Sequence, residues 1–306
     1  MKKIKIVEVG LRDGLQNETS QLSVEQRFDL FESLVRAGIK NIEIGAFVSP
    51  KWVPQMAVTS ELTGMILSDT AINKKKLNLP VLVPNVEGML KAIEADVKEV
   101  AIFAAASESF SKKNINCTIA ESFKRFEDVM LLAHEHKIKV RGYLSTCFGC
   151  PFEGKVSEDK VVRLAKKMRD LGVYEISVGD TIGVATPAQV QSLFKKLKKV
   201  VPVSQLAGHF HDTRGTALAN ILAAYQVGVS VFDSSIGGLG GCPYAPGAAG
   251  NVATEDVVYM FEGMKVKTGV SVEKLVEVNR WLQPLINHPL SSKMGRAGKS
   301  VPIGKI

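Results

Sequence analysis

Short apolar segments alternate with longer amphipathic segments along almost the whole chain. The short segments are apolar at successive positions, as parallel strands are when both faces of their sheet are covered. In the longer segments the apolar residues recur at helical spacing. We therefore predict strands at Lys5–Val9, Asn41–Gly45, Asn78–Val83, Glu99–Ala105, Lys139–Ser145, Tyr174–Gly179, Leu206–His211 and Val231–Ile236. The predicted helices are Ser23–Ala37, one ending near Leu67, Val86–Ala95, Ile119–Lys137, Ser157–Leu171, Thr186–Val200, Thr216–Gly228, Thr254–Gly263 and Ser271–Leu285.

Eight strand–helix units in a row predict an α/β protein, a TIM (β/α)8 barrel with a C-terminal helical extension. A doubly wound open sheet is the alternative, although it usually has fewer units and a reversal of strand order. We expect one catalytic domain over residues 1–306, in which the residues from about 266 to 306 form the extension. The tail Asn287–Ile306 is rich in Gly, Ser and Pro, and we predict that it is mobile.

The composition, 45% hydrophobic and 23% charged over 306 residues, is typical of a soluble enzyme. The net charge of +8 is spread over separate lysine groups without interleaved aromatic residues, so we expect no nucleic-acid partner. No apolar run is long enough to span a membrane, and the chain enters its first strand without an apolar signal segment. Four cysteines without framework spacing fit a reducing compartment. We expect a cytoplasmic protein without membrane association.

The stretch Gly208–Asp212 contains two histidines, His209 and His211, two residues apart. Residues at this spacing point to the same side of a strand but to different sides of a helix. A predicted strand leads into the stretch and a helix follows, so both imidazoles should reach one metal ion at a C-terminal strand end. The pair His134 and His136 has the same spacing within a helical pattern and is predicted to be an ordinary surface pair.

Charged and polar residues recur at the strand ends, where the active sites of TIM barrels lie. They are Arg12 and Asp13 after the first strand, Glu43 within the second, Asp180 after the sixth, and Asn251 beyond the eighth. Two imidazoles need a hard ligand to form a strong divalent site, and the set Asp13, His209, His211 and Asn251 supplies oxygen ligands. Such a set fits Mg²⁺ or Mn²⁺, with Zn²⁺ or Co²⁺ as further options. Taken singly, Asp13 would instead cap a turn and Asn251 the helix at Thr254.

Arg12 suits the stabilisation of a developing oxyanion, such as the enolate of a thioester, with a surface salt bridge as the alternative. Glu43 and Asp180, at the ends of buried strands, need partners to stay ionised. Either can pair with Arg12 or hold the second nitrogen of a ligand histidine. For Glu43 a structural ion pair is as good an interpretation as a catalytic role.

The loop Gly237–Cys242 has four glycines in five residues before its cysteine. Such a loop at the active face can close as a lid, on which the thiol of Cys242 would donate a proton. Cys147 and Cys150 form a CxxC motif without a second pair, which does not favour a metal or redox role. Cys117 is interpreted as structural.

Together these segments resemble the 3-hydroxy-3-methylglutaryl-CoA lyases of the DRE-TIM metallolyase superfamily. The resemblance covers about residues 4 to 265 and rests on the segments Val7–Glu18, Ala46–Met56, Gly179–Gly183, His209–Asp212 and Gly237–Tyr244. The superfamily shares the Arg-Asp-Gly and HxH features. The Gly-Gly-Cys-Pro loop and the Ser-Pro-Lys-Trp-Val-Pro-Gln segment are more particular to the lyases.

The resemblance implies a retro-Claisen cleavage of an acyl-CoA substrate, 3-hydroxy-3-methylglutaryl-CoA, to acetyl-CoA and acetoacetate, as in leucine and ketone-body metabolism. It implies that the divalent cation is held by Asp13, His209, His211 and Asn251. Arg12 would stabilise the enolate and Cys242 would protonate it, with His209 and Asp13 assisting proton transfer. Glu43, Asp180 and Gln16 would support the site, and the candidates for the CoA phosphates are Lys51 and Lys293. A homo-oligomer is left open.

Three alternatives are kept. A lyase for another branched 3-hydroxyacyl-CoA would carry the same signals. A Claisen-type synthase of citramalate or isopropylmalate would share them too, although such relatives tend to carry a further regulatory domain and the Cys242 loop favours the lyase. The third alternative is a non-catalytic barrel that only binds metal.

Overall fold

Eight parallel strands are hydrogen-bonded in the order β1-β8-β7-β6-β5-β4-β3-β2 in the computed structural model, which describes residues 3–241 and 250–298. A parallel bridge between Glu8 and Ile42 joins the two ends of this ladder, so the sheet closes on itself. The strands are β1 (Lys5–Glu8), β2 (Gly45–Ala46), β3 (Val81–Leu82), β4 (Glu99–Ala105), β5 (Lys139–Ser145), β6 (Glu175–Asp180), β7 (Leu206–Phe210) and β8 (Val231–Ser234). The closed ladder without reversal confirms the predicted TIM barrel and excludes the open doubly wound sheet.

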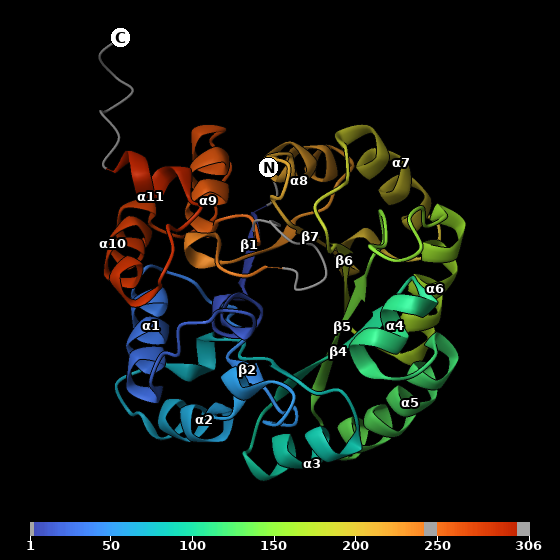
Figure 1. Cartoon of the computed structure of the whole chain (residues 1–306), viewed down its shortest axis with the longest axis horizontal. Helices are drawn as coiled ribbons and strands as arrows, with labels where there is room; N and C mark the ends of the chain where they lie inside the picture. Colours follow the sequence, from blue (N-terminus) through green and yellow to red (C-terminus); the bar gives the residue numbers. More distant parts are fainter. Residues whose placement is uncertain (1–2, 242–249, 299–306) are drawn as a thin grey trace.

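Helices surround the strands on the outside of the barrel (Figure 1). They are α1 (Val24–Arg36), α2 (Thr59–Ser68), α3 (Val86–Glu94), α4 (Glu108–Ile115), α5 (Ile119–Glu135), α6 (Glu158–Leu171), α7 (Pro187–Leu197), α8 (Ala217–Gln226), α9 (Thr254–Gly263), α10 (Val272–Leu282) and α11 (Lys293–Ala297). Every predicted helix is present with its ends shifted by a few residues at most. Capping boxes at Ser23 and Thr118 begin α1 and α5, which explains why those starts are readable from the sequence.

The structure differs from the predicted elements mainly in two places. The predicted strand Asn41–Gly45 contributes only isolated bridges at Asn41 and Ile42 before the short β2, and after β4 helix α4 replaces a predicted loop. This helix begins at Ser107, whose hydroxyl accepts from the N–H of Phe110, and ends at Asn116 in the left-handed region. It buries only Phe110 and Ser111, so the apolar periodicity that predicts a helix is nearly absent. β3 is shorter than predicted because Pro80, just before it, has no N–H for the ladder.

The hydrophobic core lies between the outer face of the strands and the inner faces of the helices. Phe232 of β8, for example, stacks on Phe261 of α9 with ring centroids 5.7 Å apart. The interior of the barrel instead contains charged side chains, among which Arg141, Glu175 and Asp233 are almost completely buried. Buried charges require partners, and those partners connect the interior to the site described below.

The tail of the C-terminal extension is anchored by hydrogen bonds over its described part, residues 287–298. The N–H of Asn287 donates to Ser20 Oγ, and the N–H of Ser291 donates to the carbonyl of Gly237 at 3.0 Å. The described part of the tail thus has partners that lie far away in the sequence and leave no trace in composition. Residues 299–306 lie outside the described part. None of the helices in the described ranges is both long and apolar enough to cross a membrane.

Candidate metal centre and active site

A π-helical turn, Gly10–Gly14, follows β1 and carries Arg12 and Asp13. The turn packs so closely that a Cβ at Gly10 would lie 2.6 Å from Glu8 Oε1. This oxygen accepts from the N–H groups of Gly10 and Ile236, so a larger residue would displace it from both hydrogen bonds. Turns of this kind occur frequently at functional sites. The Gly-Leu-Arg-Asp-Gly sequence thus places an arginine and an aspartate at the C-terminal end of the first strand.

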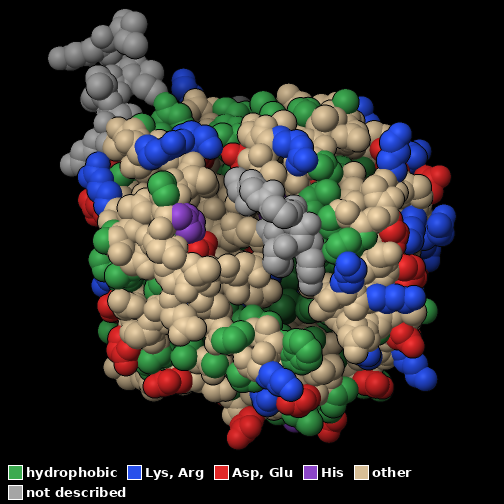
Figure 2. Space-filling view, viewed as in Figure 1, with side chains coloured by type: hydrophobic (Ala, Val, Ile, Leu, Met, Phe, Trp, Pro, Cys, Tyr) green, Lys and Arg blue, Asp and Glu red, His purple; other side chains and the backbone are tan. Residues whose placement is uncertain are grey.

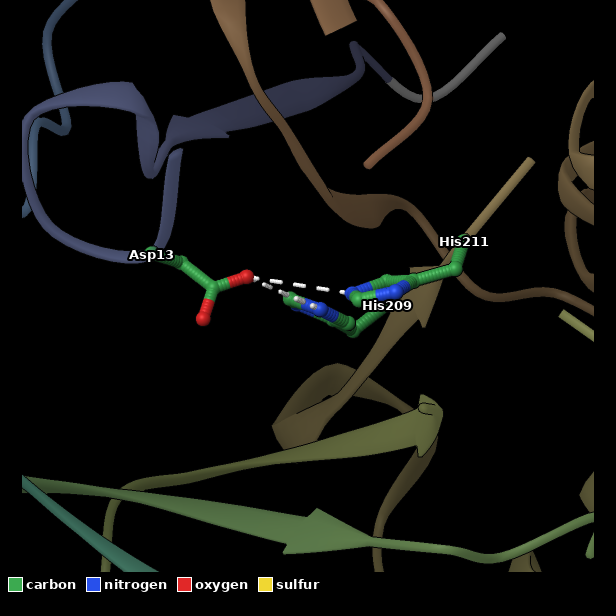
Figure 3. A group of neighbouring side chains, drawn as sticks. All are labelled: Asp13, His209 and His211. Carbon is green, nitrogen blue, oxygen red and sulfur yellow. Dashed lines mark ion pairs between the residues drawn. The ribbon is translucent and has the colours of Figure 1, made fainter. Parts of the chain in front are cut away.

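Asp13, His209 and His211 come together at the C-terminal ends of β1 and β7 (Figure 3). Asp13 Oδ2 lies 3.7 Å from His209 Nε2 and 3.8 Å from His211 Nε2. One ligand-capable atom from each residue lies within 4.8 Å of the others. Both histidines face the same side of β7, as the two-residue spacing predicts.

Asn251 lies beside this cluster. Its Nδ2 donates to Asp13 Oδ2 at 2.8 Å and to the Leu239 carbonyl at 3.2 Å, and its backbone forms a bridge with His211. The alternative that Asn251 caps the following helix is wrong, because α9 begins after Ala253 without a side-chain cap. With its amide reversed, Asn251 would present an oxygen to a cation held by Asp13.

The donor set fits a divalent cation, since it combines one carboxylate with two imidazoles and an adjacent amide. Burial acts to raise the pKa of Asp13, but the Arg12 guanidinium and the two imidazoles outweigh it and hold that pKa well below its usual value. Asp13 is therefore an anionic ligand at neutral pH. The comparison pair, His134 and His136, is exposed at the end of α5 as predicted. Within residues 3–241 and 250–298, Asp13, His209 and His211 form the one metal-capable group of this kind.

Arg12 is buried and paired on two sides. Its Nε donates to Glu43 Oε2 at 2.6 Å and its NH1 donates to Asp13 Oδ1 at 2.6 Å. The Tyr143 hydroxyl donates to the same Glu43 oxygen at 3.1 Å, and the Tyr143 ring centroid lies 5.2 Å from the guanidinium. Burial acts to lower the pKa of Arg12, but Glu43 and Asp13 raise it further than burial lowers it. The predicted Glu43–Arg12 pairing is confirmed, and the surface salt bridge considered for Arg12 is excluded.

Asp180 makes neither of the contacts predicted for it. Its carboxylate oxygens accept from the N–H groups of Val184 and Ala185 at 2.9 and 3.0 Å, so it fixes the loop after β6. The second nitrogen of a ligand histidine is held instead by Asp233 of β8, because His209 Nδ1 lies 3.1 Å from Asp233 Oδ2. Asp233 is not among the site residues predicted from the sequence. The available signal was a carboxylate inside an otherwise apolar strand, which must have a buried partner.

The glycine-rich loop follows β8 and begins with a short 3-10 turn. Backbone N–H groups of this turn donate to two buried carboxylates. The N–H of Ile236 donates to Glu8 Oε1 at 2.9 Å, and the N–H of Gly237 donates to Glu255 at 3.1 and 3.2 Å. Burial raises the pKa of both carboxyl groups to about 7, against the opposing effect of these hydrogen bonds. The base of the loop is thus attached to the first strand and to α9.

The far end of the described loop contacts the segment after the π-helical turn. Asn17 Nδ2 donates to the carbonyl of Gly241 at 2.9 Å. Gln16, the neighbour of Asn17, is half-buried one turn beyond Arg12. Cys242, the predicted proton donor, lies outside the described residues.

Of the two lysines considered for CoA, Lys293 is the one with a contact near the metal cluster. Its Nζ lies 3.5 Å from Asp212 Oδ2, next in sequence to His211, and its side chain is 62% exposed. Lys51 is exposed in the turn that precedes α2. On the face drawn in Figure 2, basic side chains are interspersed with acidic ones and form no continuous stripe.

The three cysteines of the described part are buried and free. Cys147 Sγ donates to the Leu144 carbonyl at 3.0 Å, and Cys150 Sγ lies 2.9 Å from Ser107 Oγ. Burial raises the pKa of Cys147. Reactive cysteines need thiolate character and access, so the CxxC pair and Cys117 have the features of structural thiols.

A parallel barrel that gathers a carboxylate, two imidazoles and a buried arginine at the C-terminal ends of its strands belongs to the class of metal-binding TIM-barrel enzymes. The comparisons with known proteins narrow this class. A family model described as HMGL-like matches residues 3–282. The chain therefore belongs to the HMGL-like family, whose members depend on a divalent metal.

Individual relatives agree with this assignment. The mitochondrial hydroxymethylglutaryl-CoA lyase of Rattus norvegicus is 52% identical over 296 residues, which cover 97% of this chain and 90% of that protein. The crystal structure of the hydroxymethylglutaryl-CoA lyase from Pseudomonas aeruginosa matches with a TM-score of 0.92 at 46% identity, covering 97% of each chain. An HMG-CoA lyase from Acinetobacter baumannii, solved in complex with coenzyme A and 3-methylmalate, matches with a TM-score of 0.92 at 37% identity, covering 99% of this chain and 98% of that one.

Proposed function

We propose that this chain is a divalent-metal-dependent carbon–carbon lyase that cleaves 3-hydroxy-3-methylglutaryl-CoA to acetyl-CoA and acetoacetate. The observation that carries the proposal is the position of Arg12, which is held by Glu43 against the Asp13–His209–His211 cluster. Membership of the HMGL-like family and lyases of about half identity over nearly the whole chain support it.

The cation would be held by Asp13, His209, His211 and Asn251. The mixture of oxygen and imidazole ligands favours Mg²⁺ or Mn²⁺, and Zn²⁺ or Co²⁺ are compatible with it. When bound, the cation supplies Lewis-acid polarisation of the substrate's tertiary hydroxyl and lowers the pKa of that hydroxyl. Asp13 contributes the negative charge that a hard cation requires.

The proposed reaction is a retro-Claisen cleavage that balances without a co-reactant. The tertiary hydroxyl would pass its proton to one of the side chains proposed to assist proton transfer, Asp13 or His209. Its oxygen becomes the ketone oxygen of acetoacetate as the C2–C3 bond breaks. The bonding pair stays with the thioester fragment as an enolate, whose oxygen Arg12 stabilises. One proton then adds to the enolate carbon to give acetyl-CoA. Cys242 is the proposed donor, with His209 and Asp13 assisting proton transfer.

Further residues are proposed to support the site or to bind the CoA part of the substrate. Glu43 orients Arg12 through the 2.6 Å ion pair. Gln16 and Asp180 are proposed to support the site, Asp180 through the loop that it fixes. Lys293 and Lys51 are the proposed candidates for the CoA phosphates, since both are exposed basic side chains.

The test is incubation of the purified protein with 3-hydroxy-3-methylglutaryl-CoA and Mg²⁺, with acetoacetate and acetyl-CoA measured separately. We expect equal amounts of the two products and no turnover after chelation with EDTA. Absence of product from metal-loaded protein would overturn the substrate assignment. The alternative of a lyase for another branched 3-hydroxyacyl-CoA would then be favoured. Formation of citramalate or isopropylmalate from acetyl-CoA and a 2-oxo acid would favour the synthase.

We also propose that residues 1–306 form a single catalytic domain, with residues from about 266 onward as its extension, and that the protein is cytoplasmic. The hydrogen bonds between residues 287–292 and the barrel support the single domain. The free cysteines are compatible with a reducing compartment. Light scattering would establish whether it forms a homo-oligomer.

A further inference from the structure

Behind the metal cluster, the barrel interior contains a continuous chain of buried charged side chains. Arg141 of β5 donates through NH1 and NH2 to the two oxygens of Asp233 at 3.2 and 2.7 Å, and through Nε to Glu175 at 2.8 Å. Glu175 in turn pairs with Lys5. The chain therefore runs from the opposite end of the barrel to Asp233, which contacts His209.

Asp233 is placed to act as an acceptor only. Besides Arg141, it receives the Ser177 hydroxyl at 2.6 Å on the same oxygen that faces His209. The two Arg141 NH groups and the Ser177 hydroxyl thus all donate to the carboxylate of Asp233. A carboxylate that accepts from these donors suits the tautomer of His209 with its proton on Nδ1. His209 Nε2 then faces the cluster, 3.7 Å from Asp13 Oδ2.

The two ligand histidines differ in this respect. His209 is held through Nδ1, whereas His211 Nδ1 is buried and has no hydrogen-bond partner among residues 3–241 and 250–298. A ligand imidazole whose other nitrogen is bound by a carboxylate is fixed in tautomer and orientation and is more basic. The charged residues of the barrel interior therefore fix the orientation of His209 but not that of His211.

We propose that Asp233, held in place by Arg141 and Ser177, is a positioning residue that presents His209 Nε2 to the divalent cation. The inference rests on the metal site of the proposed function and deepens it.

The test is Asp233→Asn, which keeps the volume of the side chain. The amide can turn its NH₂ group toward His209 and so favour the wrong tautomer. Binding of Mn²⁺, followed by electron paramagnetic resonance without substrate, should weaken by about 10-fold to 100-fold. The visible spectrum of the Co²⁺-loaded protein should change as well. The matched control is Glu99→Gln, which removes another buried carboxylate of the barrel that is bonded to Tyr174 instead of a histidine; it should bind Mn²⁺ as the parent does.

Because the Asn variant can fail to fold, Ser177→Ala provides a second measurement. It removes one hydrogen bond to Asp233 and leaves the Arg141 pair intact, so we expect a smaller, few-fold loss of Mn²⁺ affinity. Parental affinity in both variants would overturn the positioning role, as would a loss of kcat in Asp233→Asn with unchanged Mn²⁺ binding. His211→Ala in the same titration tests the proposed metal site separately from the positioning role of Asp233. If this variant also binds Mn²⁺ with parental affinity, the assignment of the metal site is wrong.

Discussion

Arg12 and Glu43 form a 2.6 Å ion pair in the closed interior of the site, and only one oxygen of Glu43 takes part in it. The other, Oε1, is buried without a hydrogen-bond partner in the described part of the chain. Burial raises the pKa of Glu43 although Arg12 opposes it. The pair is therefore costly to build, which is consistent with a task for Arg12 that needs a fixed orientation.

We expect Glu43→Ala to lower kcat by about 10-fold to 100-fold, because a misaligned Arg12 no longer meets the enolate oxygen. The same variant should lose roughly 3 kcal/mol of unfolding free energy, since it leaves a buried guanidinium with one partner fewer. Glu43→Gln retains an oxygen for Arg12 Nε and should lose less of both. Steady-state kinetics and urea unfolding measure the two effects. A parental kcat in Glu43→Ala would contradict the proposal that Glu43 orients Arg12 for catalysis.

Cys242→Ala should lose most lyase turnover while it binds Mn²⁺ with parental affinity, because the thiol is proposed to donate a proton and not to hold the metal. Cys117→Ala is the matched control, since that buried thiol follows α4 and is not part of the metal-capable group, and it should keep its activity. Unchanged turnover in Cys242→Ala would rule out the proton-donor role.

Glu255 should make stability depend on pH. Burial raises its pKa to about 7, above the value of an unfolded glutamate, so the folded state binds more protons between about pH 4.5 and 7. Stability from this group is therefore highest at low pH and declines as the pH rises through that window. Glu255→Gln keeps an acceptor for Gly237 and removes the titration. Relative to the parent, it should gain roughly 1 to 3 kcal/mol between pH 5 and pH 8 in urea unfolding. Parallel pH profiles would contradict this.

His288 should act in the same direction but more weakly. Its Nε2 lies 2.7 Å from Glu18 Oε2; burial acts to lower its pKa, and the Glu18 and Pro289 hydrogen bonds raise it overall. Stability from this pair is present below the unfolded histidine pKa, near pH 6.5, and is lost as the pH rises through the higher folded value. Because His288 is half-exposed, the contribution should stay under about 1 kcal/mol. His288→Gln should be less stable than the parent at pH 5.5 and match it at pH 9.

The sequence predicts the barrel well wherever local signals agree. The bounds of β4 and β5 match their predicted ranges, because short apolar runs between two helical segments are typical of buried parallel strands. The HxH motif is equally informative, since its spacing has chemical meaning only on a strand. For α4 the local signal is weak, because most of its side chains remain in contact with water.

The partner of His209 could not be predicted in the same way. Asp233 and Arg141 lie 92 residues apart, on β8 and β5, and no local pattern links the two charges. Which face of a parallel strand points into a barrel depends on closure and tilt, which no local pattern determines. From the sequence, Asp180 or Glu43 was the expected partner for the second nitrogen of a ligand histidine. In the closed barrel that partner is Asp233, on β8.

The anchoring of the chain's last described segment has a consequence for biogenesis. Gly237, at the base of the glycine-rich loop, receives the N–H of Ser291, and Asn287 is attached to Ser20. A ribosome makes the barrel strands first and these contacts last. A nascent chain that already has all eight strands therefore still lacks these contacts to the base of the loop until residue 291 has been added and folds back.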